Sequence, residues 1–415
     1  MPPLSAVGIS GLQAGEDVKT PITVLFLNSC VHGGGAGRSL DALLRVADPR
    51  IRPIVAMPEP GVMAARLEGA ARLAFVPEFV ERLSRSPYAW PDRLGVPWAH
   101  LPANGYALPR ALGELARLVE ETRPDVIHCN HMLAKPLGAA LGARTRIPVV
   151  FHSRACHHLW IDGAFYDWLG RRRIVRRIIC NSEASARVYR RHSADKVRII
   201  PNSLDPAQFD RRTVAPRLRD EFGLAPEDFV VGFIGRIHEK KGIDWLLRAF
   251  ARLAPDATGP RLAIVGGNDS SLHYDAIARY TELAAALGVR ERAVFTGYRD
   301  DVRPYLADFD VLVFPSVEPE SFGRVLLEAM ALEIPVITSA HGGAVEVVRN
   351  GEEGLWVPAN DVDGLAAAIR ALQGERDRAR AMGAHGRARV ERCYEPTVIA
   401  HRVYDVLLEA AAERP

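Results

Sequence analysis

The sequence predicts an α/β protein made of two Rossmann-like domains that face each other across a deep cleft. The chain has 415 residues, which is more than one ordinary hydrophobic core organises. Short apolar runs alternate with longer helical patterns along most of it, as in βαβ units with parallel sheets. A polar, proline-broken stretch in the middle divides this alternation into two series, so we expect two domains of similar size.

The first series predicts an N-terminal domain at residues 21–205. Its expected strands are short and apolar: Ile22–Leu27, Val126–His128, Val149–Phe151, Ile178–Cys180 and Val197–Ile200. Between the first two, Leu108–Glu121 carries apolar residues at helical spacing. Residues 1–20 lack the cationic and apolar segments of a signal peptide, and we expect them to form a loose leader.

The second series predicts a C-terminal domain at residues 227–390, joined to the first by a linker at 206–226. The linker is arginine-rich and broken by Pro216 and Pro226. The expected strands of this domain are Val230–Ile234, Arg261–Val265, Ala293–Thr296, Val311–Phe314 and Pro335–Thr338, and helices are expected at Ile243–Leu253 and Tyr280–Leu287. Residues 374–390 predict an exposed helix, and residues 391–415 a C-terminal helix that could pack back on the N-terminal domain.

Composition places the chain among ordinary globular proteins. Hydrophobic residues make up 48% and charged residues 25%, and the net charge of +3 is too small to favour nucleic acid as the main partner. Five scattered cysteines without a CxxC pair indicate reduced thiols. No apolar run reaches the length of a membrane span. These features predict a cytoplasmic protein whose contact with membranes, if it has any, is at the surface.

A glycine-rich turn follows the first expected strand, in the segment His32–Ser39. Glycines let the backbone approach a ligand, and a helix N-terminus after the turn would favour an anion. The segment does not fit the dinucleotide fingerprint, because its third glycine position is Arg38. It is not a Walker loop either, because no Gly-Lys-Ser/Thr follows. We predict that Gly35 and Gly37 contact a ligand; the alternative is an ordinary strand-to-helix turn.

A second candidate follows the first strand of the C-terminal half. Gly235 permits a tight exit from the strand, and Arg236 and Lys241 can converge on a pair of phosphates. Two cations of this kind would neutralise a diphosphate leaving group as its charge develops. The alternative is a basic surface loop with no ligand.

The third candidate, residues 320–328, follows the strand Val311–Phe314. Glu320 lies in the loop beyond the strand, and Glu328 lies one to two turns into the next helix. Between them are four residues expected to offer free backbone N–H groups at the helix start: Gly323, Arg324, Val325 and Leu326. One carboxylate could bind sugar hydroxyls and the other ribose, while the amides hold phosphate. The alternative for a lone glutamate on a helix is a solvated face, although apolar neighbours surround Glu328.

Taken together, the C-terminal half resembles the family 4 glycosyltransferases, which are retaining enzymes of the GT-B fold. The matching segments are Gly235-Arg236 with Lys241-Gly242, residues 261–267, Phe295–Tyr298, residues 310–316, Glu320–Gly323 with Leu327–Met330, and Ile334–Ile337 with Gly342-Gly343. They cover most of residues 229–370. The N-terminal half resembles the family more weakly, through the glycine-rich turn, residues 124–128 and residues 201–205, where Ser203 replaces the commoner glycine.

The resemblance implies a role for each matching residue. Arg236 and Lys241 would bind the donor diphosphate, Glu320 the sugar and Glu328 the ribose, with Tyr298 also on the donor side. His152 occupies the place of the family's active-site histidine, although a histidine after a strand is ordinarily structural. The implied reaction transfers a hexose-type sugar from a nucleoside diphosphate donor, with retention and without a metal or other cofactor. The acceptor could be a glycan, a lipid-linked molecule or a small molecule.

Two alternatives to the transferase stay open at this point. One is a sugar-nucleotide epimerase of the same architecture, which would turn over without an acceptor. The other is a catalytically silent nucleotide-binding module.

Three further signals are discounted or left open. Cys156, His157 and His158 match no ordinary zinc spacing. Asp361-Val362-Asp363 is expected to cap a helix rather than bind a metal. The basic run Arg171–Arg177, echoed by Arg187, Arg190 and Arg191, fits either a solvated surface or contact with anionic lipid.

Overall fold

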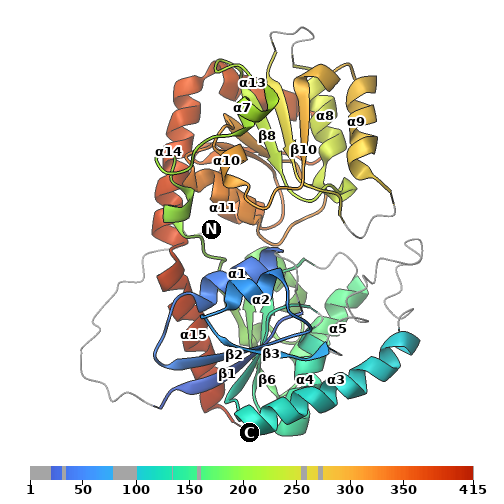
Figure 1. Ribbon diagram of the computed structural model, residues 1–415, viewed down its shortest axis with the longest axis vertical. Helices are drawn as coiled ribbons and strands as arrows, with labels where there is room; N and C mark the ends of the chain where they lie inside the picture. The colour runs from blue at the N-terminus through green and yellow to red at the C-terminus, as the bar shows by residue number, and fades with distance from the viewer. Residues whose placement is uncertain are drawn as a thin grey trace, which may run out of the picture.

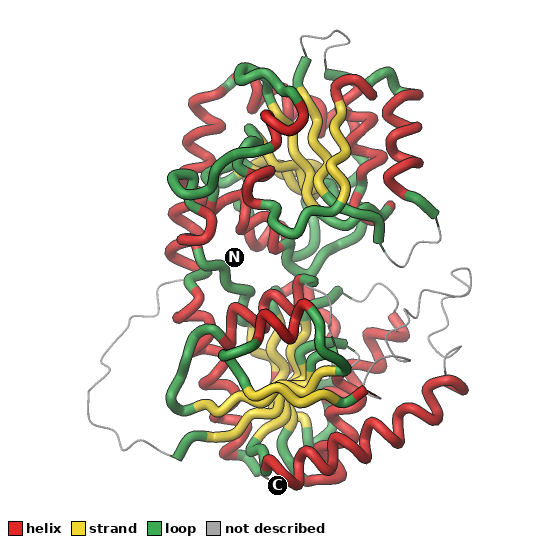
Figure 2. Tube along the Cα trace, viewed as in Figure 1, coloured by secondary structure: helices red, strands yellow, loops and turns green. Residues whose placement is uncertain are grey.

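The computed structural model consists of two lobes, each built around one sheet (Figure 1). It describes residues 20–29, 34–77, 101–132, 134–156, 160–253, 259–269 and 274–414. The expected leader therefore lies almost wholly outside the described residues, as do His32 and Gly33 of the glycine-rich turn. The strands of each lobe run side by side with helices around them (Figure 2).

The sheet of the N-terminal lobe has the order β3-β2-β1-β4-β5-β6-β7, and every pairing is parallel. Its strands are β1 (Ile22–Leu27), β2 (Ile51–Met57), β3 (Arg72–Phe75), β4 (Val126–Cys129), β5 (Val149–Ser153), β6 (Val175–Cys180) and β7 (Val197–Ile199). The five strands expected from the sequence are confirmed. β2 and β3 were not expected.

The sheet of the C-terminal lobe has the order β10-β9-β8-β11-β12-β13, again parallel throughout. Its strands are β8 (Val230–Ile234), β9 (Arg261–Val265), β10 (Ala293–Gly297), β11 (Val311–Phe314), β12 (Val336–Ser339) and β13 (Gly354–Val357). Here too the expected strands are confirmed and one edge strand, β13, was not expected.

Helices cover both faces of each sheet, as parallel sheets require. In the N-terminal lobe they are α1 (Gly35–Leu44), α2 (Val62–Leu67), α3 (Leu101–Thr122), α4 (Ala134–Thr145), α5 (Trp160–Gly170) and α6 (Glu183–Ala186). In the C-terminal lobe they are α8 (Ile243–Ala251), α9 (Ala276–Ala286), α10 (Arg303–Leu306), α11 (Arg324–Ala331), α12 (Ala344–Val347) and α13 (Val362–Gly374). Among the described residues, no helix is long and apolar enough to cross a bilayer.

The last two helices run along the molecule from one lobe to the other (Figure 1). The helix α14 (Arg376–Cys393) packs against α11. A Cβ on Gly383 would clash with the carbonyl of Glu333, and one on Gly386 would press on the side chain of Met330. The helix expected here is confirmed and most of its residues are exposed, but the prediction missed that one face of α14 is buried. The helix α15 (Pro396–Ala412) packs against the N-terminal sheet, and the Tyr404 hydroxyl donates to the carbonyl of Leu43 at 2.7 Å.

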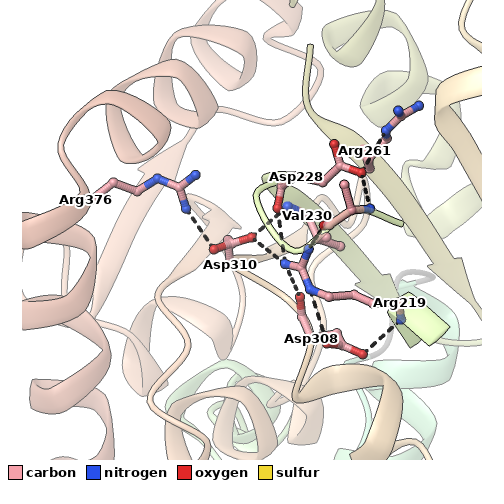
Figure 3. Close-up of polar contacts among 8 residues, drawn as sticks. Arg219, Asp228, Val230, Arg261, Asp308, Asp310 and Arg376 are labelled. Carbon is pink, nitrogen blue, oxygen red and sulfur yellow. Dashed lines mark hydrogen bonds and ion pairs between the residues drawn. The ribbon is translucent and has the colours of Figure 1, made fainter. Parts of the chain in front are cut away.

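The segment between the two sheets is held against the C-terminal lobe. It contains the short helix α7 (Leu218–Phe222), whose Leu218 is fully buried. Arg219 on α7 forms ion pairs with Asp308 and Asp310, both at 3.3 Å, and donates to nearby carbonyls (Figure 3). Asp310 also accepts from the backbone N–H of Val230 at 2.8 Å, so the same carboxylate joins this segment to the start of β8.

Candidate functional site

Most of the predicted site residues lie where the order of the C-terminal sheet changes direction. The chain proceeds outward from β8 through β9 to β10, then returns to the other side of β8 as β11. Loops that leave β8 and β11 diverge at this point, which is where open parallel sheets bind ligands. Arg236 and Lys241 follow β8, and Glu320 follows β11, so residues 79 or more positions apart in sequence meet at one edge.

The centre of this edge is a contact between Lys241 and Glu320. The ammonium group of Lys241 donates to Oε1 of Glu320, and the hydroxyl of Ser316 donates to the same oxygen at 2.6 Å. The side chains of Lys241 and Glu320 are 21% and 26% exposed, so the pair is largely desolvated but open to a ligand. The structure thus brings together the predicted phosphate-binding cation and the predicted sugar-binding carboxylate.

Glycines let the loops around this pair approach each other closely. Gly242, directly after Lys241, has φ of 71°, and a Cβ there would lie 1.9 Å from the carbonyl oxygen of Pro315. On the other side, the N–H of Gly343 donates to the carbonyl of Glu320 at 2.7 Å. A Cβ on Gly343 would lie 2.1 Å from the carbonyl oxygen of Ser321. The backbone on both sides of Glu320 is therefore fixed by contacts that only glycine allows.

Arg236 lies beside this centre in a different contact. Its guanidinium forms an ion pair with the buried carboxylate of Asp269 at 2.6 Å, while its side chain is 74% exposed. Gly235, which precedes it, donates its N–H to the carbonyl of Val265, so the exit of β8 is tied to β9. Tyr298 is 70% exposed, and its hydrogen bond to Asp300 raises the pKa of the phenol.

The helix α11 starts at the same edge and carries the predicted amides. Gly323 forms its N-cap with φ of 83°, and Arg324 and Val325 are the first helical residues, where α-helix geometry leaves N–H groups without a carbonyl. Leu326 is different. Its N–H donates to the carbonyl of Gly323 at 2.9 Å, so the expectation of a free amide at Leu326 was wrong; the αL turn at Gly323 brings that carbonyl within reach.

Glu328 lies inside the lobe rather than on a solvated face, with only 4% of its surface exposed. Arg324, one turn earlier, donates from Nε to its Oε1 at 3.2 Å. Arg38 of α1, in the other lobe, approaches the same oxygen at 4.0 Å. Burial is the largest influence on the pKa of Arg324 and lowers it. The carboxylate of Glu328 is therefore placed by two cations, one from each lobe.

In the N-terminal lobe, the glycine-rich turn continues into α1. Gly35 is its first residue and has open space where a Cβ would be, whereas a Cβ on Gly37 would press on Met63. The remaining predicted residue, His152, is 3% exposed near the end of β5. His128 of β4 and Arg154 both contact its Nδ1, at 3.1 and 3.2 Å.

Hydrogen bonds across the lobe interface lie next to the loop that carries Glu320, which we call the donor loop because Glu320 is expected to bind the sugar donor. Ser321 donates from its hydroxyl to the carbonyl of Arg154 at 2.8 Å. The carboxylate of Glu346 accepts from the backbone N–H groups of Glu183 and Ala184 at 2.8 and 2.9 Å. The interface thus joins Ser321, which follows Glu320, to Arg154, which lies two residues after His152.

The discounted signals fall elsewhere. Asp361 is the N-cap of α13 and accepts from the N–H of Gly364 at 2.8 Å, which confirms the expected cap. No group of three or more metal-ligating side chains occurs among the described residues, and His157 and His158 lie outside them. The basic run divides in two, since Arg177 pairs with Glu409 and Glu413 of α15.

Three residues of the site were not predicted: Ser316, Asp269 and Arg154. Ser316 could have been noticed as a hydroxyl four residues before Glu320. Asp269 and Arg154 stand in no motif, and only the folded chain shows that one holds Arg236 and the other His152. A hollow lined by residues of β1, β2 and the end of α3 contains none of the site residues.

Both halves of the chain match known protein families. Residues 33–208 match the family described as Glycosyltransferase Family 4, and residues 228–375 match Glycosyl transferases group 1. A D-inositol 3-phosphate glycosyltransferase of Mycobacterium marinum is 30% identical over 388 residues, which are 89% of this chain and 77% of that protein. One of Nocardia farcinica is 34% identical over 281 residues, and these span 62% of this chain and 61% of that protein.

Among solved structures, HepE of Anabaena in complex with UDP-glucose is similar over 94% of this chain and 100% of its own, with a TM-score of 0.77 and 23% identity. Sucrose-phosphate synthase of Thermosynechococcus elongatus has a TM-score of 0.75 and 22% identity, over 94% of this chain and 99% of its own. These likenesses show the two-sheet GT-B fold that the sequence predicted. On the matches in both halves and the length of the mycobacterial alignment, the chain belongs to glycosyltransferase family 4.

Proposed function

We propose that this protein transfers a hexose-type sugar from a nucleoside diphosphate sugar to an acceptor, with retention at the anomeric carbon. The observation that carries the proposal is the contact of Lys241 with Glu320 at the switch point of the C-terminal sheet. It supports the proposal because the cation that we expect to bind the diphosphate lies beside the carboxylate that we expect to bind the sugar. The buried Glu328 one helix further on can accept hydrogen bonds from ribose hydroxyls. HepE, whose structure holds UDP-glucose, supports a donor of this class.

In the proposed mechanism the acceptor oxygen attacks on the face from which the diphosphate leaves. The bond from the anomeric carbon to the diphosphate oxygen breaks and the bond to the acceptor oxygen forms. The departing phosphate takes the acceptor proton. Arg236, Lys241 and the amides at the start of α11 stabilise the negative charge that develops on the diphosphate. His152 and Glu320 orient the sugar.

Two cations at the diphosphate position allow the reaction to proceed without a metal. Turnover in the presence of EDTA should therefore match turnover with added Mg²⁺. A requirement for Mg²⁺ would contradict this part of the proposal.

The epimerase alternative is not favoured, because the relatives described above carry glycosyltransferase names.

The decisive experiment starts with a thermal-shift screen of nucleotide sugars, since a ligand that binds only the folded state raises its stability. The best donor is then incubated with and without a panel of glycan, lipid-linked and small acceptors that includes inositol phosphates. We expect sugar transfer only with an acceptor, and NMR of the product should show the donor's anomeric configuration. Epimerisation of the donor alone, or inversion, would contradict the proposal. A protein that binds the donor but transfers nothing would be the silent module.

We also propose that the enzyme works in the cytoplasm and contacts anionic membrane surfaces through the first part of the basic run. Arg171, Arg172 and Arg173 are exposed at the end of α5. Trp168, 42% exposed, lies under the guanidinium of Arg172 at 3.9 Å from the ring centroid. Arginines beside an exposed aromatic ring suit the charged interface of an anionic bilayer. Vesicles with 30% phosphatidylglycerol should co-sediment the protein, and the triple change of these arginines to Gln should abolish this, whereas equal binding to neutral vesicles would contradict it.

A further inference from the structure

The side chain of His152 is held at one nitrogen by two neighbours. Arg154 approaches Nδ1 with a terminal guanidinium nitrogen at 3.2 Å. His128 approaches the same Nδ1 with its Nε2 at 3.1 Å, and the two imidazole rings meet edge to face. Arg154 is itself fixed, because it also donates to the side-chain oxygen of Asn202.

A guanidinium has only donors, and this decides the role of Nδ1. Because Arg154 cannot accept a hydrogen bond, Nδ1 of His152 must accept one and carries no proton. The proton of the neutral ring is therefore on Nε2. Burial and the neighbouring Arg324 lower the pKa of Arg154 to about 9, which still leaves it cationic at neutral pH.

The same logic extends to His128. Its Nε2 faces an accepting nitrogen, so Nε2 of His128 must carry the proton and donate it. Its Nδ1 is buried and has no hydrogen-bond partner among the described residues, so on this assignment it is an unpaired acceptor.

The groups around His152 oppose a positive charge on its ring. Arg154 lies at the end of the same strand, His128 on β4 and the fully buried Lys135 on α4. Burial first, then Arg154, His128 and Lys135, lower the pKa of His152 well below its ordinary value. The ring is neutral over the physiological range, and its tautomer is set by the contacts at Nδ1.

We propose that Arg154, supported by His128, is a positioning residue that keeps His152 as the neutral Nε2–H tautomer, so that His152 donates a hydrogen bond to the bound sugar. The role in turnover rests on the function proposed above. On this account His152 is a donor and not a general base. Arg154 also connects His152 to the donor loop, because its carbonyl accepts from Ser321, next to Glu320.

The tautomer can be measured without any substrate. In protein labelled with ¹⁵N at its 13 histidines, two-bond ¹⁵N–¹H correlations distinguish Nε2–H from Nδ1–H, and the His152→Gln variant identifies the signals of His152. We expect Nε2–H at pH 7 in the wild type and in Arg154→Lys, which keeps an obligatory donor. In Arg154→Met, Nδ1 of His152 is free to carry the proton and donate to His128, so the Nδ1–H signal should appear. A wild-type His152 on Nδ1–H, or an unchanged tautomer in Arg154→Met, would overturn the proposal.

The kinetic arm tests what the tautomer does. Arg154→Met should lower kcat at least about tenfold and leave the KM for the donor within about twofold, and Arg154→Lys should recover most of the loss. Arg248→Met, at an exposed arginine of α8 paired with Asp244, is the matched control and should behave as wild type. Full kcat in Arg154→Met despite a changed tautomer would overturn the functional part. If the wild type transfers no sugar at all, the proposed function fails, while the NMR arm still decides the tautomer.

Discussion

Lys135 provides the sharpest quantitative prediction because it is a buried cation that pairs with no carboxylate in the part of the chain that the structure describes. Its side chain is fully buried on α4, and its ammonium group donates to the hydroxyls of Ser153 at 3.1 Å and Tyr189 at 2.9 Å. The rings of Tyr166 and Tyr189 lie 5.1 and 5.6 Å from the nitrogen. Burial lowers the pKa of Lys135 from 10.5 to about 8.

The lowered pKa fixes how stability depends on pH. Between pH 8 and 10.5 the unfolded chain keeps the proton that the folded protein releases, so the free energy of unfolding rises with pH. With the two pKa values given above, this gain is about 1.4 kcal/mol by pH 9 and about 2.5 kcal/mol by pH 10. Below pH 8, Lys135 is charged in both the folded and the unfolded protein. The free energy of unfolding is then lowered by the full cost of burying the charge.

The assay compares the wild type with Lys135→Met, so that the titrating groups not coupled to Lys135 cancel. Thermal unfolding of both proteins is followed from pH 7 to pH 10, and the difference in Tm is plotted against pH. As pH rises, the Tm of the wild type should increase relative to that of the variant, by about 5 to 10 °C at pH 10 for a lobe of this size. A difference that stays constant, or a variant that gains on the wild type, would refute the assignment of a depressed pKa to Lys135.

Three further predictions concern the loops and the interface. Gly242→Ala should lower the Tm by several degrees more than Gly223→Ala, because both have positive φ but only the first would clash with backbone. Glu346→Gln should raise amide hydrogen exchange at the start of α6 by roughly 5- to 30-fold, since it weakens two charge-assisted hydrogen bonds across the lobe interface; unchanged exchange would show that these bonds contribute nothing. Arg219→Met should cost about 3 kcal/mol in urea unfolding of the C-terminal lobe because it removes the ion pair of the buried Asp308 carboxylate, whereas Arg248→Met, which removes an exposed pair, should cost under about 0.5 kcal/mol.

The central strands of both sheets were predictable because they are mostly buried and apolar. The strands that were missed lie toward or at the edges, where the burial pattern is mixed. β2 contains Pro53, which argues against a strand in the sequence. β3 and β13 are only four residues long; β3 has no fully buried position, and β13 has both exposed and buried ones. The buried face of α14 was missed because arginines and small residues dominate its sequence, and its packing depends on glycines lying against α11.

The candidate site was predictable where a short motif carries its own geometry. Glu320, Gly323 and Glu328 stand in one strand-loop-helix segment, so their spacing alone places them together. Contacts between distant segments, such as His128 with His152 across two strands or Arg38 with Glu328 across the lobes, depend on the tertiary fold. The prediction of a free amide at Leu326 was wrong for a local reason, because the αL turn at Gly323 brings a carbonyl within reach of that amide.

The central claim is that Lys241 and Glu328 hold different parts of one donor, the diphosphate and the ribose. Isothermal titration calorimetry tests it with the nucleoside diphosphate of the best donor and with the corresponding nucleoside. Lys241→Met should weaken the binding of the diphosphate by about 10- to 100-fold and leave the binding of the nucleoside unchanged. Glu328→Gln should weaken the binding of both ligands. Equal losses for the two ligands in Lys241→Met, or no loss in either variant, would contradict the account.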